Sequence, residues 1–254
     1  MTAAVLEFGI RAASVGDRLS IYERRLSPAR ERLLNGRWAR RVRQRAFTRD
    51  EMEAFLLWFT SQGIGMARPV EAWSRRAGQR CIELGFDELG EALLAQDRHE
   101  FGHDVLLRDD ALGLAWRWNG HNSRIDVDRL FAQPPTLGAR RYARLHEDVI
   151  DGPTPYCQLA IEYEIERLSA VLGPAFIATT MAACGPEIRL CLSSVEDQVW
   201  LDQGHARLDE YQLRQFLDDH PGALPALVDA GSAALDAYGR YLEDCLDLAL
   251  TTAS

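Results

Sequence analysis

Apolar residues in this chain recur at helical spacing in one segment after another, and glycine or proline separates the segments. This spacing is typical of amphipathic helices that bury one face. Clear examples lie at residues 48–63, 155–172 and 224–248. No group of segments alternates apolar and polar residues around hairpin turns, as the strands of a sheet do. The pattern therefore predicts an all-α protein of about seven to nine helices.

The order of the predicted helices indicates one domain over residues 1–254, in which residues 1–45 could form peripheral helices. The chain contains neither a repeat nor a low-complexity tract. One helix is expected to end at Gly113, followed by a long connection that includes a short helix at residues 126–131. A second helix is expected to end at Gly173-Pro174, because proline removes a backbone donor.

Composition excludes several classes of protein. The chain has 29 basic and 38 acidic side chains and a formal net charge of -9. Such an acidic balance argues against a nucleic-acid surface, although every basic side chain is Arg. No signal peptide and no apolar run long enough to span a membrane are recognisable. The five cysteines are scattered without Cys-x-x-Cys spacing, which favours reduced thiols and a cytoplasmic location.

The first candidate for a functional site is a Glu-x-x-His pair. Glu100 and His103 are one helical turn apart within an apolar run, so they would share a helix face. Pairs of this kind, pointing into a helical bundle, hold non-haem iron in several proteins. A histidine at helical spacing is more often an ordinary core or surface residue, so this pair needs matching groups elsewhere.

A second candidate is the very apolar helix that follows Pro155, which carries Glu162, Glu164 and Glu166. Glu162 and Glu166 share a face, whereas Glu164 points elsewhere. A buried carboxylate needs a counter-ion or a metal, since its desolvation is costly. The sequence leaves two interpretations open, namely a metal site or salt bridges to Arg140, Arg141 or Arg167.

A third candidate is Asp202-x-x-His205, in which Gly204 leaves room for close approach. Two carboxylate-x-x-His pairs, with a glutamate-bearing helix between them, match the ligands of carboxylate-bridged di-iron sites. The remaining histidines are interpreted as structural or surface residues: His99, His121, His146 and His220.

These segments resemble the haem-oxygenase-like di-iron oxidases and oxygenases, whose fold is shared with the thiaminase II and pyrroloquinoline-quinone synthase C proteins. Residues 100–113 resemble the family's Glu, Gly-His and Leu-Gly pattern. Residues 160–169 are similar to its central Glu-bearing helix, and residues 201–205 to its late helix. The order and intervals agree, and the resemblance covers most of the chain, because residues 34–36 and 55–59 also resemble the early helices.

The resemblance implies a ligand set for two Fe(II) ions. Glu100, His103 and one of Glu162 or Glu166 would hold one iron, and one of these two glutamates would bridge to the second. Dioxygen would be the co-substrate. The reaction implied is the oxidation of a small amine, amino acid or fatty-acid-like molecule, in specialised metabolism.

The second iron would be held by Asp202, His205 and Gln198. Gln198 occupies the position where the family carries a histidine, and an amide oxygen is a weaker iron ligand than imidazole. Glu196 or Asp197 could take its place after a small shift in register.

The expected partner is a small-molecule substrate, with neither nucleic acid nor membrane, and a homodimer is compatible with the sequence. Arg140-Arg141 or the early arginines could bind a substrate carboxylate. One alternative is a metal-independent enzyme like thiaminase II or pyrroloquinoline-quinone synthase C, with the carboxylates in acid-base roles. A second alternative is a non-catalytic helical interaction protein.

Overall fold

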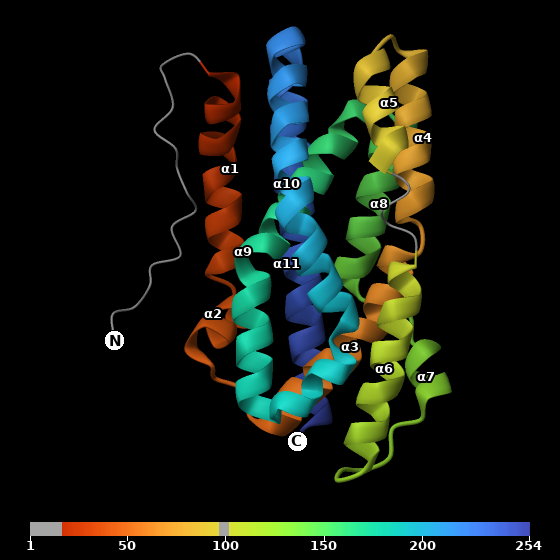
Figure 1. Cartoon of the computed structure of the whole chain (residues 1–254), viewed down its shortest axis with the longest axis vertical. Coiled ribbons are helices and arrows are strands. Elements are labelled where there is room, and N and C mark those ends of the chain that lie inside the picture. The colour runs from red at the N-terminus through yellow and green to blue at the C-terminus, as the bar shows by residue number, and fades with distance from the viewer. Residues whose placement is uncertain (1–16, 97–101) are drawn as a thin grey trace.

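The computed structural model describes residues 17–96 and 102–254, without the side chains of residues 96 and 200–207. Within these ranges the chain forms eleven α-helices and three short 3-10 helices, and no strand. Most of the helices run roughly along the long axis of the molecule (Figure 1). The predicted all-α class is confirmed.

The helices follow one another with short connections. In chain order they are α1 (Arg18–Leu34), α2 (Arg37–Gln44), α3 (Arg49–Ala67), α4 (Val70–Glu83), α5 (Asp87–Gln96), α6 (His103–Asn119), α7 (Val127–Phe131), α8 (Leu137–Asp151), η1 (Pro155–Cys157), α9 (Gln158–Cys184), η2 (Pro186–Cys191), α10 (Ser193–Asp219), η3 (Pro221–Ala223) and α11 (Leu224–Thr252).

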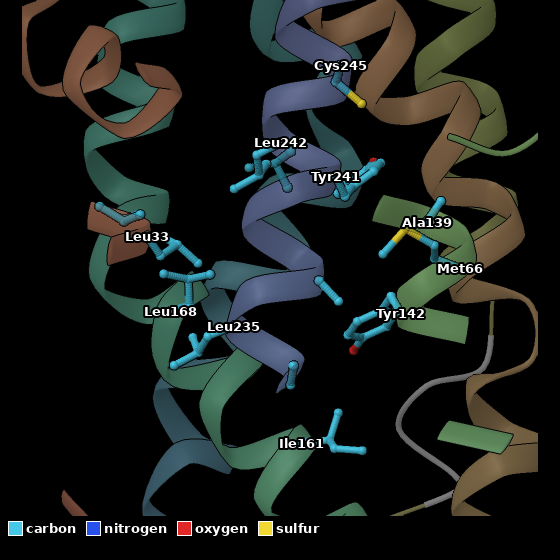
Figure 2. Close-up of a cluster of buried hydrophobic side chains, with 14 of the residues drawn as sticks. Leu33, Met66, Ala139, Tyr142, Ile161, Leu168, Leu235, Tyr241, Leu242 and Cys245 are labelled. Atoms are coloured by element: carbon cyan, nitrogen blue, oxygen red, sulfur yellow. The ribbon is translucent and has the colours of Figure 1, made fainter. Parts of the chain in front are cut away.

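Helix α11 lies at the centre of the bundle and contacts α1, α3, α8 and α9. Figure 2 shows Tyr241 and Leu242 of α11 among buried side chains of its neighbours, such as Met66 of α3 and Tyr142 of α8. Burial of this apolar surface is the main favourable term that holds the helices together. Helix α1 also belongs to this core, since Tyr22 is fully buried.

Two predicted helix ends are wrong, and in both cases packing between helices explains the glycine. Gly113 lies inside α6, where a Cβ would come 2.8 Å from Sγ of Cys191. Gly173 lies inside α9, where a Cβ would come 2.1 Å from Cγ2 of Val199. Pro174 follows within the same helix. Tertiary contacts outweigh the local helix-breaking tendency here, as they often do. The short helix predicted at residues 126–131 is confirmed as α7.

By length and composition, one helix of the described residues, Pro155–Cys184, could span a membrane, whereas the sequence indicated none. It comprises η1 and α9, which contact α10, α11, α2 and α3. The central helix of a water-soluble bundle meets the same test.

Candidate functional site

A cavity of about 210 Å³ lies between α3, α8, α9, α10 and α11. Most of its wall is apolar or aromatic, and a minority of polar side chains reach it from α6, α9 and α10. Its lining comprises Trp38, Phe59, Gly63, Met66, Ala67, Val70, His103, Leu107, Tyr142, Glu162, Ile165, Glu166, Leu168, Ser169, Leu172, Gly173, Phe176, Ser194, Val195, Gln198, Val199, Tyr238, Tyr241 and Leu242. An apolar cavity with a few convergent polar groups is typical of a small-molecule site.

Four of the predicted site residues line this cavity: His103, Glu162, Glu166 and Gln198. His103 is buried in the first turn of α6. It follows Gly102, whose φ of 93° is in the left-handed region that favours glycine. Three segments that are distant in the sequence thus supply an imidazole, two carboxylates and an amide to the lining of one cavity.

The other predicted ligands are Glu100, Asp202 and His205. Glu100 lies outside the described residues, as do the side chains of Asp202 and His205. The backbone of α10 is helical through positions 198, 202 and 205, which therefore share a helix face by spacing. Their part in the site stays a prediction.

Glu164 points away from the cavity, as predicted. Its carboxylate accepts hydrogen bonds from Nε and Nη2 of Arg30 at 2.8 and 2.6 Å, and from the Tyr22 hydroxyl at 3.0 Å. Arg30 is held on its other side by Glu23, with 2.5 Å between Nη1 and Oε2. This buried network joins α1 to α9 and leaves the cavity face of α9 to Glu162 and Glu166.

The arginines that were considered as substrate ligands lie elsewhere. Arg140 and Arg141 are exposed, and neither lines the cavity. In the early segment, Arg37 pairs with Glu243, at 2.9 Å, and with Asp247. No Lys or Arg occurs among the described residues that line the cavity. The suggestion that Arg140 or Arg141 binds a substrate carboxylate gains no support from the cavity and stays a prediction.

Glu162 is oriented from behind by two donors. Its Oε1 accepts hydrogen bonds from Oγ of Ser74 on α4 and from Nε2 of Gln158, both at 2.9 Å. Gln158 in turn lies 2.9 Å from Nδ1 of His146, measured to Oε1. Burial lowers the pKa of His146 to about 4, so its imidazole is neutral at pH 7.

His146 was interpreted from the sequence as a structural or surface residue, and its link to the cavity was missed. It lies one turn after Tyr142 on the apolar face of α8, which also carries Val149 and Ile150. This position signals burial. The hydrogen bond to Gln158 involves a different helix and has no signature in the sequence.

His103 contacts one of the two residues that were considered as substitutes for Gln198. Its Nε2 lies 3.3 Å from Oδ2 of Asp197 on α10. Glu196, the other residue considered as a substitute for Gln198, pairs with Arg189 at 2.7 Å. Of the two, Asp197 is thus the one that reaches a predicted ligand.

The donor set of the cavity fits iron by its chemistry, since imidazole nitrogen and carboxylate oxygen are the ligands of non-haem Fe(II). Among the side chains that the structure describes, no three of the types His, Cys, Asp and Glu gather closely enough to hold a metal ion. A complete ligand set would therefore need groups beyond those described, such as the predicted Asp202 and His205.

Comparison with solved structures is informative about the fold. No protein-family model matches the chain, and no curated protein matches it. The structure is similar to the crystal structure of a domain of unknown function with a haem-oxygenase-like fold from Shewanella denitrificans OS217. The TM-score is 0.71 over 92% of this chain and 94% of the other.

The chain has a haem-oxygenase-like fold. The sequence identity to the Shewanella domain is 11%, so the likeness concerns the fold alone. In this haem-oxygenase-like bundle, the cavity lies between α3, α8, α9, α10 and α11. Its polar wall comprises His103 of α6, Glu162 and Glu166 of α9, and Gln198 of α10. Function within such a fold depends on the site residues and not on the fold.

Proposed function

We propose that this protein is a non-haem iron enzyme, an oxidase or oxygenase that uses dioxygen to oxidise a small and largely apolar substrate. One observation carries the proposal: His103, Glu162, Glu166 and Gln198, from three separate helices, line one mostly apolar cavity. Burying carboxylates is costly, and here two of them line the same mostly apolar cavity as an imidazole.

In this proposal His103 and one of Glu162 or Glu166 would hold iron together with ligands beyond the described side chains, and Gln198 would contribute its amide oxygen. Glu100, Asp202 and His205 complete the two predicted positions. The chemistry that bound ferrous iron supplies is the reduction of dioxygen. The protein contributes orientation, since Ser74 and Gln158 hold Glu162, and an apolar wall that excludes water from the reacting groups.

The lining also narrows the substrate class. A substrate carboxylate would find no cation among the described lining residues, and it would face Glu162 and Glu166. An amine would be attracted to the same carboxylates. Among the predicted substrates, an amine with an apolar body therefore fits this cavity better than a fatty acid.

The test is the iron content per chain after anaerobic loading with ferrous iron, followed by oxygen uptake. We expect bound iron in the wild type and its loss in His103→Ala and His205→Ala. Gln198→His restores the imidazole of the family pattern and is expected to raise the iron content. Gln215→His, at an exposed position of the same helix, is the matched control and should change nothing. Wild-type protein without iron above the His103→Ala level would refute the proposal.

A second candidate is a metal-independent enzyme with acid-base roles for the polar wall. The contact between His103 and Asp197 favours it, because a carboxylate at 3.3 Å from Nε2 orients and stabilises a protonated imidazole. Iron content separates the two candidates. The metal-independent enzyme would turn over in the presence of a chelator, and its activity would fall in Asp197→Asn.

A further inference from the structure

The carboxylate of Glu162 is part of a hydrogen-bonded chain that runs from the cavity through Gln158 to His146 on α8. Gln158 and Glu162 are one turn apart on α9, and Nε2 of Gln158 donates to Oε1 of Glu162 at 2.9 Å. Ser74 donates to the same oxygen from α4. Two donors from different helices therefore fix the orientation of one carboxylate oxygen.

The Gln158 amide is held at both ends, by Glu162 at its NH2 group and by His146 at its oxygen. The amide oxygen of Gln158 can only accept, so Nδ1 of His146, at 2.9 Å, must carry the hydrogen. If the amide turned over, its oxygen would face the carboxylate of Glu162 and its NH2 group would face the N–H of His146. The contact with the acceptor-only carboxylate of Glu162 would become repulsive, so the NH2 end of Gln158 faces Glu162, and the N–H of His146 then holds the amide oxygen in place.

The imidazole of His146 is itself held rigidly. Its ring stacks on Trp73 with 4.0 Å between the centroids and 5° between the planes. Tyr142, which lines the cavity, contacts it edge-on with the ring centroids 4.7 Å apart. His146 and Gln158 are 2% and 0% exposed, so solvent does not compete for their hydrogen bond.

We propose that His146 is a positioning residue that acts through Gln158 to orient the Glu162 carboxylate toward the cavity. The importance of this arrangement for activity rests on the proposed function, in which Glu162 is a candidate iron ligand. Groups that orient metal ligands in this way contribute substantially to metal affinity, and their loss typically costs about 10–100-fold.

Two substitutions separate positioning from packing, because they have opposite effects on the two roles. His146→Asn keeps a donor near the position of Nδ1 but loses the ring that stacks on Trp73. His146→Phe keeps the ring and loses the donor. The matched control is His220→Phe, which replaces a histidine in another aromatic cluster, beside Phe86 and Phe216. Thermal denaturation establishes which variants are folded.

Two readouts are measured on each full-length variant. The first is the dissociation constant of Co(II), used as a redox-stable probe, by titration calorimetry. The second is solvent exchange of the Gln158 side-chain amide in metal-free protein, measured by nuclear magnetic resonance. For His146→Phe we expect Co(II) binding weakened at least about tenfold and faster exchange. His146→Asn and His220→Phe should stay close to the wild type.

Wild-type values for His146→Phe in both readouts would overturn the positioning role. The same conclusion would follow if folded His146→Asn protein showed the same loss of Co(II) affinity and the same faster exchange as His146→Phe. If wild-type protein binds no Co(II), the proposed metal function fails. The amide exchange then decides the positioning role by itself, since it requires no metal.

Discussion

The imidazole of His103 and the carboxylate of Asp197 meet between α6 and α10, with 3.3 Å between Nε2 and Oδ2. The histidine side chain is 10% exposed and the aspartate side chain 45%. The contact therefore lies at the edge of the cavity, between the buried polar wall and solvent. It places an acidic side chain next to Gln198 in the sequence of α10.

Replacing Asp197 by Asn tests this contact. A carboxylate that contacts an imidazole orients the ring. It also makes the imidazole a stronger metal ligand, or stabilises it in its protonated form. We expect Asp197→Asn to weaken iron binding about tenfold and to lower activity in parallel. Glu196→Gln is the control, because Glu196 pairs with Arg189. Equal effects of the two substitutions would show that only the general charge of α10 matters.

The network around Arg30 should dominate the stability of the contact between α1 and α9. Glu164 is 1% exposed and binds Arg30 through both oxygens. Removing one partner of such a buried pair costs about 3–5 kcal/mol, because the other charge is left behind. We expect this loss of unfolding free energy in Glu164→Gln, measured by urea denaturation. Breaking the exposed pair of Arg32 and Asp236 in Arg32→Gln should cost at most about 1 kcal/mol.

The same network predicts a pH dependence. Burial by itself would raise the pKa of Glu23, but hydrogen bonds and charges from Arg30 and Arg167 outweigh it and hold the pKa below its usual value. A depressed pKa contributes stability above the unfolded-state pKa, and this contribution is lost as the pH falls through the folded-state value. The stability difference between wild type and Glu23→Gln should therefore be largest at pH 7 and shrink below about pH 4. A pH-independent difference in urea denaturation would contradict this explanation.

The cavity should tolerate added volume that the core does not. Leu168 lines the cavity, so Leu168→Phe is expected to change stability by less than about 1 kcal/mol. Ile150 is fully buried and is not part of the lining. Ile150→Phe should therefore cost about 1–3 kcal/mol through overpacking. Binding of the fluorescent amine 1-aminoanthracene, titrated in both variants, should weaken only in Leu168→Phe.

Two glycines provide a test of the close helix contacts. A Cβ on Gly138 would come 2.1 Å from the backbone nitrogen of Tyr241, and backbone cannot move aside as a side chain does. Gly138→Ala should therefore lower the unfolding free energy by more than about 2 kcal/mol. A Cβ on Gly65, which is also helical, would meet nothing within 4 Å. Gly65→Ala should stabilise by up to about 1 kcal/mol, and thermal denaturation distinguishes the two outcomes.

Local features of the chain were predictable because they depend on residues a few positions apart. The apolar periodicity predicted the all-α class, and the structure confirms it. Thr48 and Glu51 form the expected capping box at the start of α3. Helical spacing also separated Glu162 and Glu166, which line the cavity, from Glu164, which binds Arg30. Each of these follows from the geometry of a single helix.

Other features depended on which helices approach one another, and the sequence by itself does not contain that information. Gly113 and Gly173 have the local character of helix ends, yet both lie where a second segment packs closely against the helix. His146 has the pattern of an ordinary core residue until α9 brings Gln158 within hydrogen-bond distance. The sequence by itself therefore determined the all-α class and the faces that individual helices bury. The tertiary structure decided which polar side chains share a cavity, because those contacts arise from packing between residues that are distant in the chain.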